Sequence, residues 1–290
     1  MFEKTRSLRK RDLPVVVLCL AASLSVATST FAASLTMTSG QSFNRSSPAN
    51  LVTNGSFEAD PGSGLFWATG TTLAVYMPIT GWVSSGGPNA YAYRSNSSPG
   101  WTPPIPHGVN SLYFGNHAAA GISQTPTFQP NGLVTFSSTP TITLQAAYTP
   151  EVTLQQTITG LSTSSTYLLS FWVSGEQAVN GGYGHDGIFG LDVTGFPTTY
   201  LAVPDGSPGS IGNQKVYQFF LQPVSSSTTI KFTNWGHFFA GFTAGWTLPS
   251  TTELILDDVV LNQVPEPATM GLLALGGLFL VRCRPRTPGV

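Results

Sequence analysis

The chain has 290 residues, of which 9% are charged and 41% are hydrophobic, whereas soluble domains usually carry about 25% charged residues. The formal net charge of −1 conceals a segregation, because eight of the twelve lysines and arginines lie in the two ends, while residues 33–264 keep four basic against ten acidic side chains. With a net charge of 4 − 10 = −6, this middle segment lacks the basic face of a nucleic-acid-binding protein, and an aromatic content of 11% excludes a disordered chain.

Residues 1–32 predict a secretory signal peptide. A basic stretch precedes an apolar run from Leu13 to Ala22, and Thr30 and Ala32 place small residues at the two specificity positions of a cleavage site. A retained membrane anchor is the alternative, but the apolar run is shorter than the ~20 residues that span a bilayer. The prediction implies an export translocon and a signal peptidase as partners.

Residues 50–263 predict one all-β domain, and residues 33–49 a flexible polar segment that leads into it. Short runs of alternating apolar and polar residues lie between glycines, prolines, asparagines and serines, and none keeps a helical apolar period. A dozen such strands predict a sandwich or a barrel, with an extra hairpin at 126–150. The clearest strands cover residues 152–158, 166–173, 215–221, 228–233 and 253–261, and weaker ones cover 50–57, 91–94, 111–114, 133–136, 142–146, 188–193 and 198–203.

The glycine-rich segment Asn180-Gly-Gly-Tyr-Gly-His-Asp-Gly187 predicts a loop. It is not a phosphate-binding loop, because it lacks a Gly-Lys-Ser/Thr sequence and precedes a strand rather than a helix. As a binding loop, it would offer Tyr183 to the face of a sugar ring and His185 or Asp186 to its hydroxyls. A hairpin connection that binds nothing is equally consistent with these residues.

Residues 234–246 are dense in aromatic side chains. If exposed, Trp235 and Trp246 suit stacking on the apolar faces of sugars, although large aromatic side chains more often pack in a core. Trp101 lies in a stiff proline-rich loop, which favours its exposure. Candidate ligand-binding residues are therefore Trp101, Tyr183, His185, Trp235 and Trp246.

Enzyme chemistry has little support in the sequence. The four histidines have no metal-ligand spacing, and no Gly-x-Ser-x-Gly nucleophile elbow is present. A glycosidase needs two carboxylates across a cleft, and nothing in the spacing of the ten acids selects a pair. We therefore expect a non-enzymatic protein without catalytic residues.

Three motifs of the middle segment resemble a known domain family. Asn50-Leu-Val-Thr-Asn-Gly-Ser-Phe-Glu58 opens the segment, Ile79-Thr-Gly-Trp82 follows, and Leu254-Ile-Leu-Asp-Asp-Val259 closes it. This order is similar to the galactose-binding-like jelly rolls of carbohydrate-binding modules and related exported domains. The resemblance implies a jelly-roll β-sandwich.

The same resemblance implies a structural calcium ion. Glu58 and Asp257, from the first and last motifs, would share the ion with backbone carbonyls, and Ca²⁺ prefers several hard oxygen ligands. Only one of Asp257 and Asp258 can point inward on an alternating strand, and the apolar pattern does not decide which. In the alternative reading, these acids cap turns or face solvent.

Residues 264–290 form a distinct tail. Pro265-Glu266-Pro267 precedes an apolar run from Met270 to Val281 and a basic cluster of Arg282, Arg284 and Arg286. This order resembles the PEP-CTERM sorting signal of exported bacterial proteins, which implies a short transmembrane helix, cytoplasmic arginines and cleavage by an exosortase. An ordinary C-terminal anchor is the alternative. The two cysteines lie in the signal peptide and the tail, so the mature protein would have none.

These patterns predict an exported, transiently membrane-anchored protein that is released to the cell surface or extracellular matrix. There, its jelly roll is expected to bind polysaccharide or to contribute structurally to the matrix. A glycan hydrolase of the cell envelope and a self-associating structural surface protein are the alternatives. The sequence names neither a ligand nor an oligomeric state.

Overall fold

The computed structural model describes residues 33–37, 50–59, 79–85, 90–96, 108, 110–116, 119–122, 124–144, 153–175, 187–203, 216–235 and 252–265. Within these ranges the strands pair antiparallel and form two large sheets, which confirms the all-β expectation. No helix among the described residues is long and apolar enough to cross a membrane. The predicted signal peptide and nearly all of the sorting tail lie outside these ranges.

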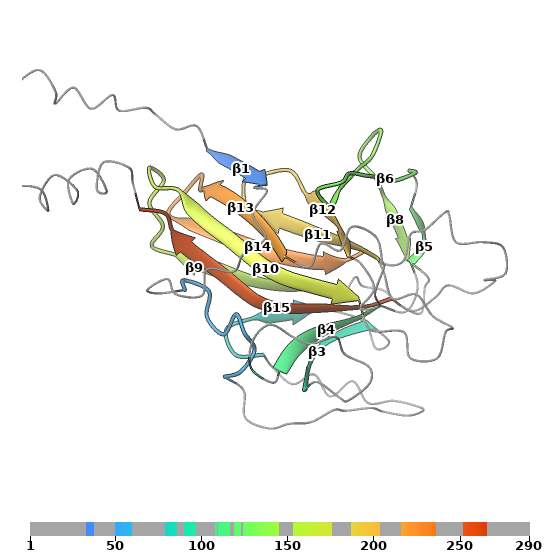
Figure 1. Cartoon of the computed structure of the whole chain (residues 1–290), viewed down its shortest axis with the longest axis horizontal. Helices are drawn as coiled ribbons and strands as arrows, with labels where there is room; N and C mark the ends of the chain where they lie inside the picture. The colour runs from blue at the N-terminus through green and yellow to red at the C-terminus, as the bar shows by residue number, and fades with distance from the viewer. Residues whose placement is uncertain are drawn as a thin grey trace, which may run out of the picture. The chain divides into compact units, whose positions relative to one another are not determined.

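The first sheet has six strands in the order β1-β13-β10-β15-β4-β3 (Figure 1). Its last strand in sequence, β15, lies in the middle, because it pairs with β10 on one side and with β4 on the other. The strands are β1 (Ser34–Met37), β13 (Val216–Gln222), β10 (Tyr167–Gly175), β15 (Thr252–Gln263), β4 (Asn110–Asn116) and β3 (Ala90–Asn96).

The second sheet has seven strands in the order β2-β9-β14-β11-β12-β7-β6. The β6–β7 hairpin lies within the predicted insert and extends this sheet beyond β12. The strands are β2 (Val83–Ser85), β9 (Thr153–Thr159), β14 (Ser227–Asn234), β11 (Gly187–Val193), β12 (Thr199–Val203), β7 (Leu133–Thr135) and β6 (Thr127–Phe128). A separate pair joins β5 (Ala119–Ile122) and β8 (Ile142–Leu144).

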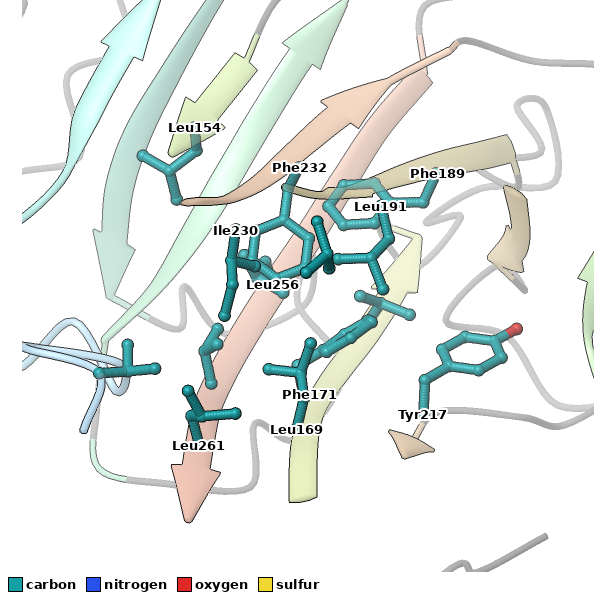
Figure 2. Close-up of a cluster of buried hydrophobic side chains, with 14 of the residues drawn as sticks. Leu154, Leu169, Phe171, Phe189, Leu191, Tyr217, Ile230, Phe232, Leu256 and Leu261 are labelled. Atoms are coloured by element: carbon teal, nitrogen blue, oxygen red, sulfur yellow. The ribbon is translucent and has the colours of Figure 1, made fainter. Parts of the chain in front are cut away.

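The hydrophobic core lies between the two large sheets. In strands β9 and β14, alternate residues point into it, as expected for strands with one buried face. The ring of Phe171 on β10 lies 5.0 Å from that of Phe232 on β14, and the ring of Phe114 on β4 lies 5.2 Å from that of Phe189 on β11. Figure 2 shows side chains of both sheets meeting in this layer. The two sheets therefore form a sandwich.

A β-bulge interrupts the alternation of β15. Leu256 and Val259 both belong to the core, although strict alternation would place residues three apart on opposite faces. The register against β10 shifts here, because Ser170 pairs with Val260 whereas Trp172 pairs with Asp257. Asp258 has a φ of +52° and supplies the additional residue.

The beginning of the domain differs from the expectation. The predicted strand at residues 50–57 is wrong, because this segment forms turns, with left-handed backbone at Asn54 and Phe57. Its polar groups do not form the regular backbone hydrogen bonds of a paired strand. They bond to other strands instead; for example, Asn50 Nδ2 donates to the Val259 carbonyl. In addition, residues 34–37 of the segment expected to be flexible form β1, which pairs with β13 and packs Leu35 and Met37 against the core.

Candidate functional site

An outer aromatic cluster lies on the face of the seven-stranded sheet that is turned away from the core. Strand β12 shows the division, because Leu201 and Val203 enter the core while Tyr200 and Ala202 join this second cluster. Buried apolar side chains form the base of the cluster, and partly buried aromatic side chains pack on them. The base consists of Val134, Ile188 and Ala202, and the aromatic side chains are Phe128, Phe136, Tyr200 and Trp235.

Three of these rings pack edge to face. The rings of Tyr200 and Trp235 lie 4.6 Å apart with planes at 77°, and those of Phe136 and Tyr200 lie 5.0 Å apart at 83°. Such arrangements favour fixed ring orientations. All three side chains remain partly accessible to solvent, so the cluster combines a rigid apolar surface with the polar atoms of Tyr200 and Trp235.

Gly190 makes room for the indole of Trp235. A Cβ atom at Gly190 would lie 2.7 Å from Nε1 of Trp235, which is closer than van der Waals contact allows. The Trp235 amide also donates to the Ile188 carbonyl at 2.9 Å. Strand β11 therefore holds both the backbone and the ring of Trp235, the one predicted binding residue within the described part of the chain.

Beside the aromatic cluster, the same face of the sheet carries polar side chains. Lys231 Nζ lies 2.8 Å from Asp192 Oδ2, and the Thr198 hydroxyl donates to Asp192 Oδ1. Farther along, the hydroxyls of Thr157 and Thr229 are 2.8 Å apart. The aromatic cluster thus borders an ion pair and a row of hydroxyls.

A second region contains the predicted calcium ligands. The Asn110 amide and the Asn110 Nδ2 each donate to one oxygen of the Glu58 carboxylate, both at 2.6 Å. Gly108 approaches so closely that a Cβ atom there would lie 2.2 Å from Glu58 Oε1. The backbone on either side of residue 109 therefore fixes this carboxylate.

Asp257 and Asp258 lie on β15, beside the strand that begins with Asn110. Leu112 pairs with Leu256 in the antiparallel register, so Asn110 and the two aspartates reach the same level of neighbouring strands. Asp257 and Asp258 are 0% and 6% exposed, and the Asp258 amide donates to Asp257 Oδ1 at 2.7 Å. Among the described residues, no group of three or more His, Cys, Asp or Glu side chains could hold a metal ion.

Several predicted site residues lie outside the described ranges. They are Trp101, Tyr183, His185, Trp246, Glu266, Pro267, Arg282, Arg284 and Arg286, whereas Pro265 is the last described residue. Conversely, Tyr200, which packs against Trp235, and Phe136, which packs against Tyr200, were not predicted from the sequence as part of the site. The alternation of residues 200–203 was a usable signal, because it places Tyr200 on the face opposite Leu201.

A comparison with protein families matches residues 263–286 to the PEP-CTERM protein-sorting motif. The chain carries a PEP-CTERM sorting signal. This motif indicates export to the cell surface through an exosortase. None of the curated proteins compared with the chain matches it.

Solved structures with a similar arrangement include two carbohydrate-binding modules. TmCBM61, solved with β-1,4-galactotriose, is 13% identical with a TM-score of 0.41, and the match covers 75% of this chain and 100% of the module. The xylan-binding CBM22-2 domain of Paenibacillus barcinonensis Xyn10C is 11% identical with a TM-score of 0.28, covering 64% of this chain and 94% of the domain.

A third match is the enzymatically active domain of tailspike protein 4 from bacteriophage CBA120. It is 11% identical with a TM-score of 0.39, and the match covers 74% of this chain but only 21% of the tailspike chain. These scores are too low to assign a function or a ligand to the chain.

Proposed function

We propose that this chain is a non-catalytic surface protein that an exosortase releases to the cell surface or extracellular matrix, where its sandwich binds a neutral glycan through the outer aromatic cluster. The observation that carries the proposal is the set of partly exposed rings of Phe136, Tyr200 and Trp235, which pack edge to face on a sheet. Fixed rings lose little conformational entropy when they stack on a sugar.

The surroundings of the cluster favour an uncharged ligand. Asp192 and Lys231 neutralise each other beside it, and the nearby threonine hydroxyls offer hydrogen bonds of the kind that sugars accept and donate. Asp192 also accepts from Thr198, so this carboxylate has a structural role. A weakly charged sheet face with a rigid aromatic patch thus suits a neutral polysaccharide better than an acidic one.

Trp235→Ala tests the glycan proposal. In affinity gels containing xylan, galactan or the host's own extracellular polysaccharide, residues 33–264 are expected to be retarded by at least one of these polymers. The variant should lose at least about tenfold in affinity, which corresponds to roughly 1.4 kcal/mol, because it removes a ring on which a sugar would stack.

Phe220→Ala is the matched control, since Phe220 is a 43% exposed aromatic residue on the other sheet. It should bind like the unmodified domain. Melting temperatures of both variants separate lost binding from lost folding. Absence of retardation in every polysaccharide, or equal losses in both variants, would contradict the proposal.

We also propose that a calcium ion stabilises the junction of Glu58 and β15. Glu58 and Asp257 would hold it, with Asp258 as the alternative to Asp257, and the ion would neutralise the carboxylates that it joins. Two observations support this role. The Glu58 carboxylate accepts hydrogen bonds from Asn110 at the start of β4, and the register of β4 against β15 places Asn110 beside the two aspartates, whose carboxylate oxygens are ligands that Ca²⁺ prefers.

Calcium is expected to raise the melting temperature of the domain, and a chelator to lower it. A ligand that binds only the folded state at 100 times its Kd adds about 2.7 kcal/mol, or roughly 5–10 °C for a domain of this size. Calorimetry with calcium, magnesium or chelator measures the shift, which Asp257→Asn and Asp258→Asn should assign to one aspartate. An unchanged melting temperature in chelator would remove the metal from the proposal.

A further inference from the structure

The two ends of the described domain meet at one end of the six-stranded sheet. Leu35 on β1 pairs with Leu221, Leu221 pairs with Tyr167, and Tyr167 pairs with Gln263 on β15. The first strand therefore begins at the same level at which the last strand ends. In Figure 1 the start of β1 and the arrowhead of β15 lie at this common end.

The sorting signal begins directly at this end of the domain. The Val264 amide still donates to the Thr166 carbonyl at 2.8 Å, and the matched motif already begins at residue 263. Only residues 265–269 separate Val264 from the apolar run that begins at Met270. A fully extended chain covers at most about 3.6 Å per residue, so this tether spans no more than about 22 Å.

Two neighbouring turns, residues 160–166 and 223–226, contribute to the surface at this end, and we call them the hydroxyl-rich end. The Leu161 amide donates to the Ser226 carbonyl at 3.0 Å, which holds the turns together. They contain no Asp, Glu, Lys or Arg. Their solvent-exposed side chains are Thr163, Ser164, Val224, Ser225 and Ser226.

We propose that, in the membrane-anchored precursor, the short tether holds the hydroxyl-rich end against the lipid bilayer. Crossing the headgroup region uses about 5–8 Å of the tether, which leaves at most about 17 Å between Val264 and the membrane surface, even with the tether fully extended. Residues 33–264 carry a net charge of −6, so anionic lipids repel a charged face, whereas an uncharged end with hydroxyl groups meets the headgroups without this repulsion. This inference rests on the sorting signal and its predicted membrane segment, and not on glycan binding.

Site-specific fluorescence quenching in the full-length precursor tests this orientation. The precursor, with Cys19→Ser and Cys283→Ser, is purified from a host without exosortase. It is then reconstituted into vesicles of phosphatidylethanolamine and phosphatidylglycerol that carry a headgroup quencher. A fluorophore is placed at Ser164→Cys or Ser226→Cys, and at Gln129→Cys as the control, because exposed Gln129 pairs with Leu133 toward the opposite end of the second sheet.

Quenching is expected to be several-fold stronger at positions 164 and 226 than at position 129. A flexible Gly/Ser spacer of about 20 residues between Val264 and Pro265 should abolish this difference, because such a spacer reaches about 25 Å on average. Equal quenching at all three positions, or a difference that the spacer leaves intact, would overturn the proposal. Quenching at position 164 that requires added exosortase would assign this end to the enzyme and equally overturn it.

Discussion

Replacing Gly55 by alanine is expected to lower the free energy of unfolding by about 3 kcal/mol, as overpacking of a tight contact does. A Cβ atom at Gly55 would lie 2.0 Å from the Val259 carbonyl oxygen, and the partner is backbone of a central strand that cannot rotate away. The Val259 amide donates to the Gly55 carbonyl at 2.9 Å, so separating the two segments also weakens a hydrogen bond. Calorimetry should show a melting temperature lower by roughly 6–12 °C.

Gly160→Ala is the control for this substitution. Gly160 has a φ of +78°, and a Cβ atom at this position would meet no other atom within 4 Å. Alanine at this position therefore causes backbone strain but no steric clash, and it should lower the free energy of unfolding by about 1 kcal/mol. A Gly55→Ala variant as stable as the Gly160→Ala variant would show that the first turn of the domain does not press against β15.

Gln156→Leu is expected to destabilise the domain by a similar amount, about 3 kcal/mol. The side chain of Gln156 accepts from the Thr53 amide at 2.8 Å and donates to the carbonyls of Thr53 and Gly81 at 2.9 and 2.8 Å. Leucine preserves the approximate volume but leaves these backbone groups without the amide, and each hydrogen bond contributes about 1 kcal/mol. Gln156 is only 7% exposed, so water replaces the lost partners poorly.

Its neighbour Gln155 provides the matched control on the same strand. Gln155 points to the opposite face and is partly exposed, so Gln155→Leu should change stability by less than about 0.5 kcal/mol. Differential scanning calorimetry of both variants of residues 33–264 makes the comparison. Equal melting temperatures would refute the view that Gln156 fastens the opening turns to β9.

The local pattern of the sequence predicted most strands of the sandwich. The five clearest predicted strands correspond to β9, β10, β13, β14 and β15. Strand β9 and most of β14 alternate between buried and more exposed residues, whereas β10 is an apolar run that is buried at almost every position. Residues 50–57 alternate weakly in sequence, but they do not form the strand predicted for them. Their conformation depends on Asn50 and Gln156, which bond backbone groups far away in the sequence, and such partners leave no periodic signal.

The candidate site was predictable only in part. Trp235 stood out by its aromatic neighbours in sequence, but the rings that surround it come from Tyr200 and Phe136, on and next to other strands. Only the pairing of β11 with β12 and of β12 with β7 brings them together. Likewise, alternation alone could not place Asp257 and Asp258, since the bulge at Asp258 changes which residues face the core.

The central position of β15 has a consequence for the timing of export. β10 and β4 share β15 as their common neighbour, so each keeps an open edge until residues 252–263 arrive. In export led by an N-terminal signal peptide, these residues cross the membrane immediately before the sorting signal. A chain that stalls or is truncated earlier exposes two unpaired strand edges, which invite aggregation or proteolysis. Under such export, the six-stranded sheet is complete only once the chain up to its sorting signal has crossed the membrane.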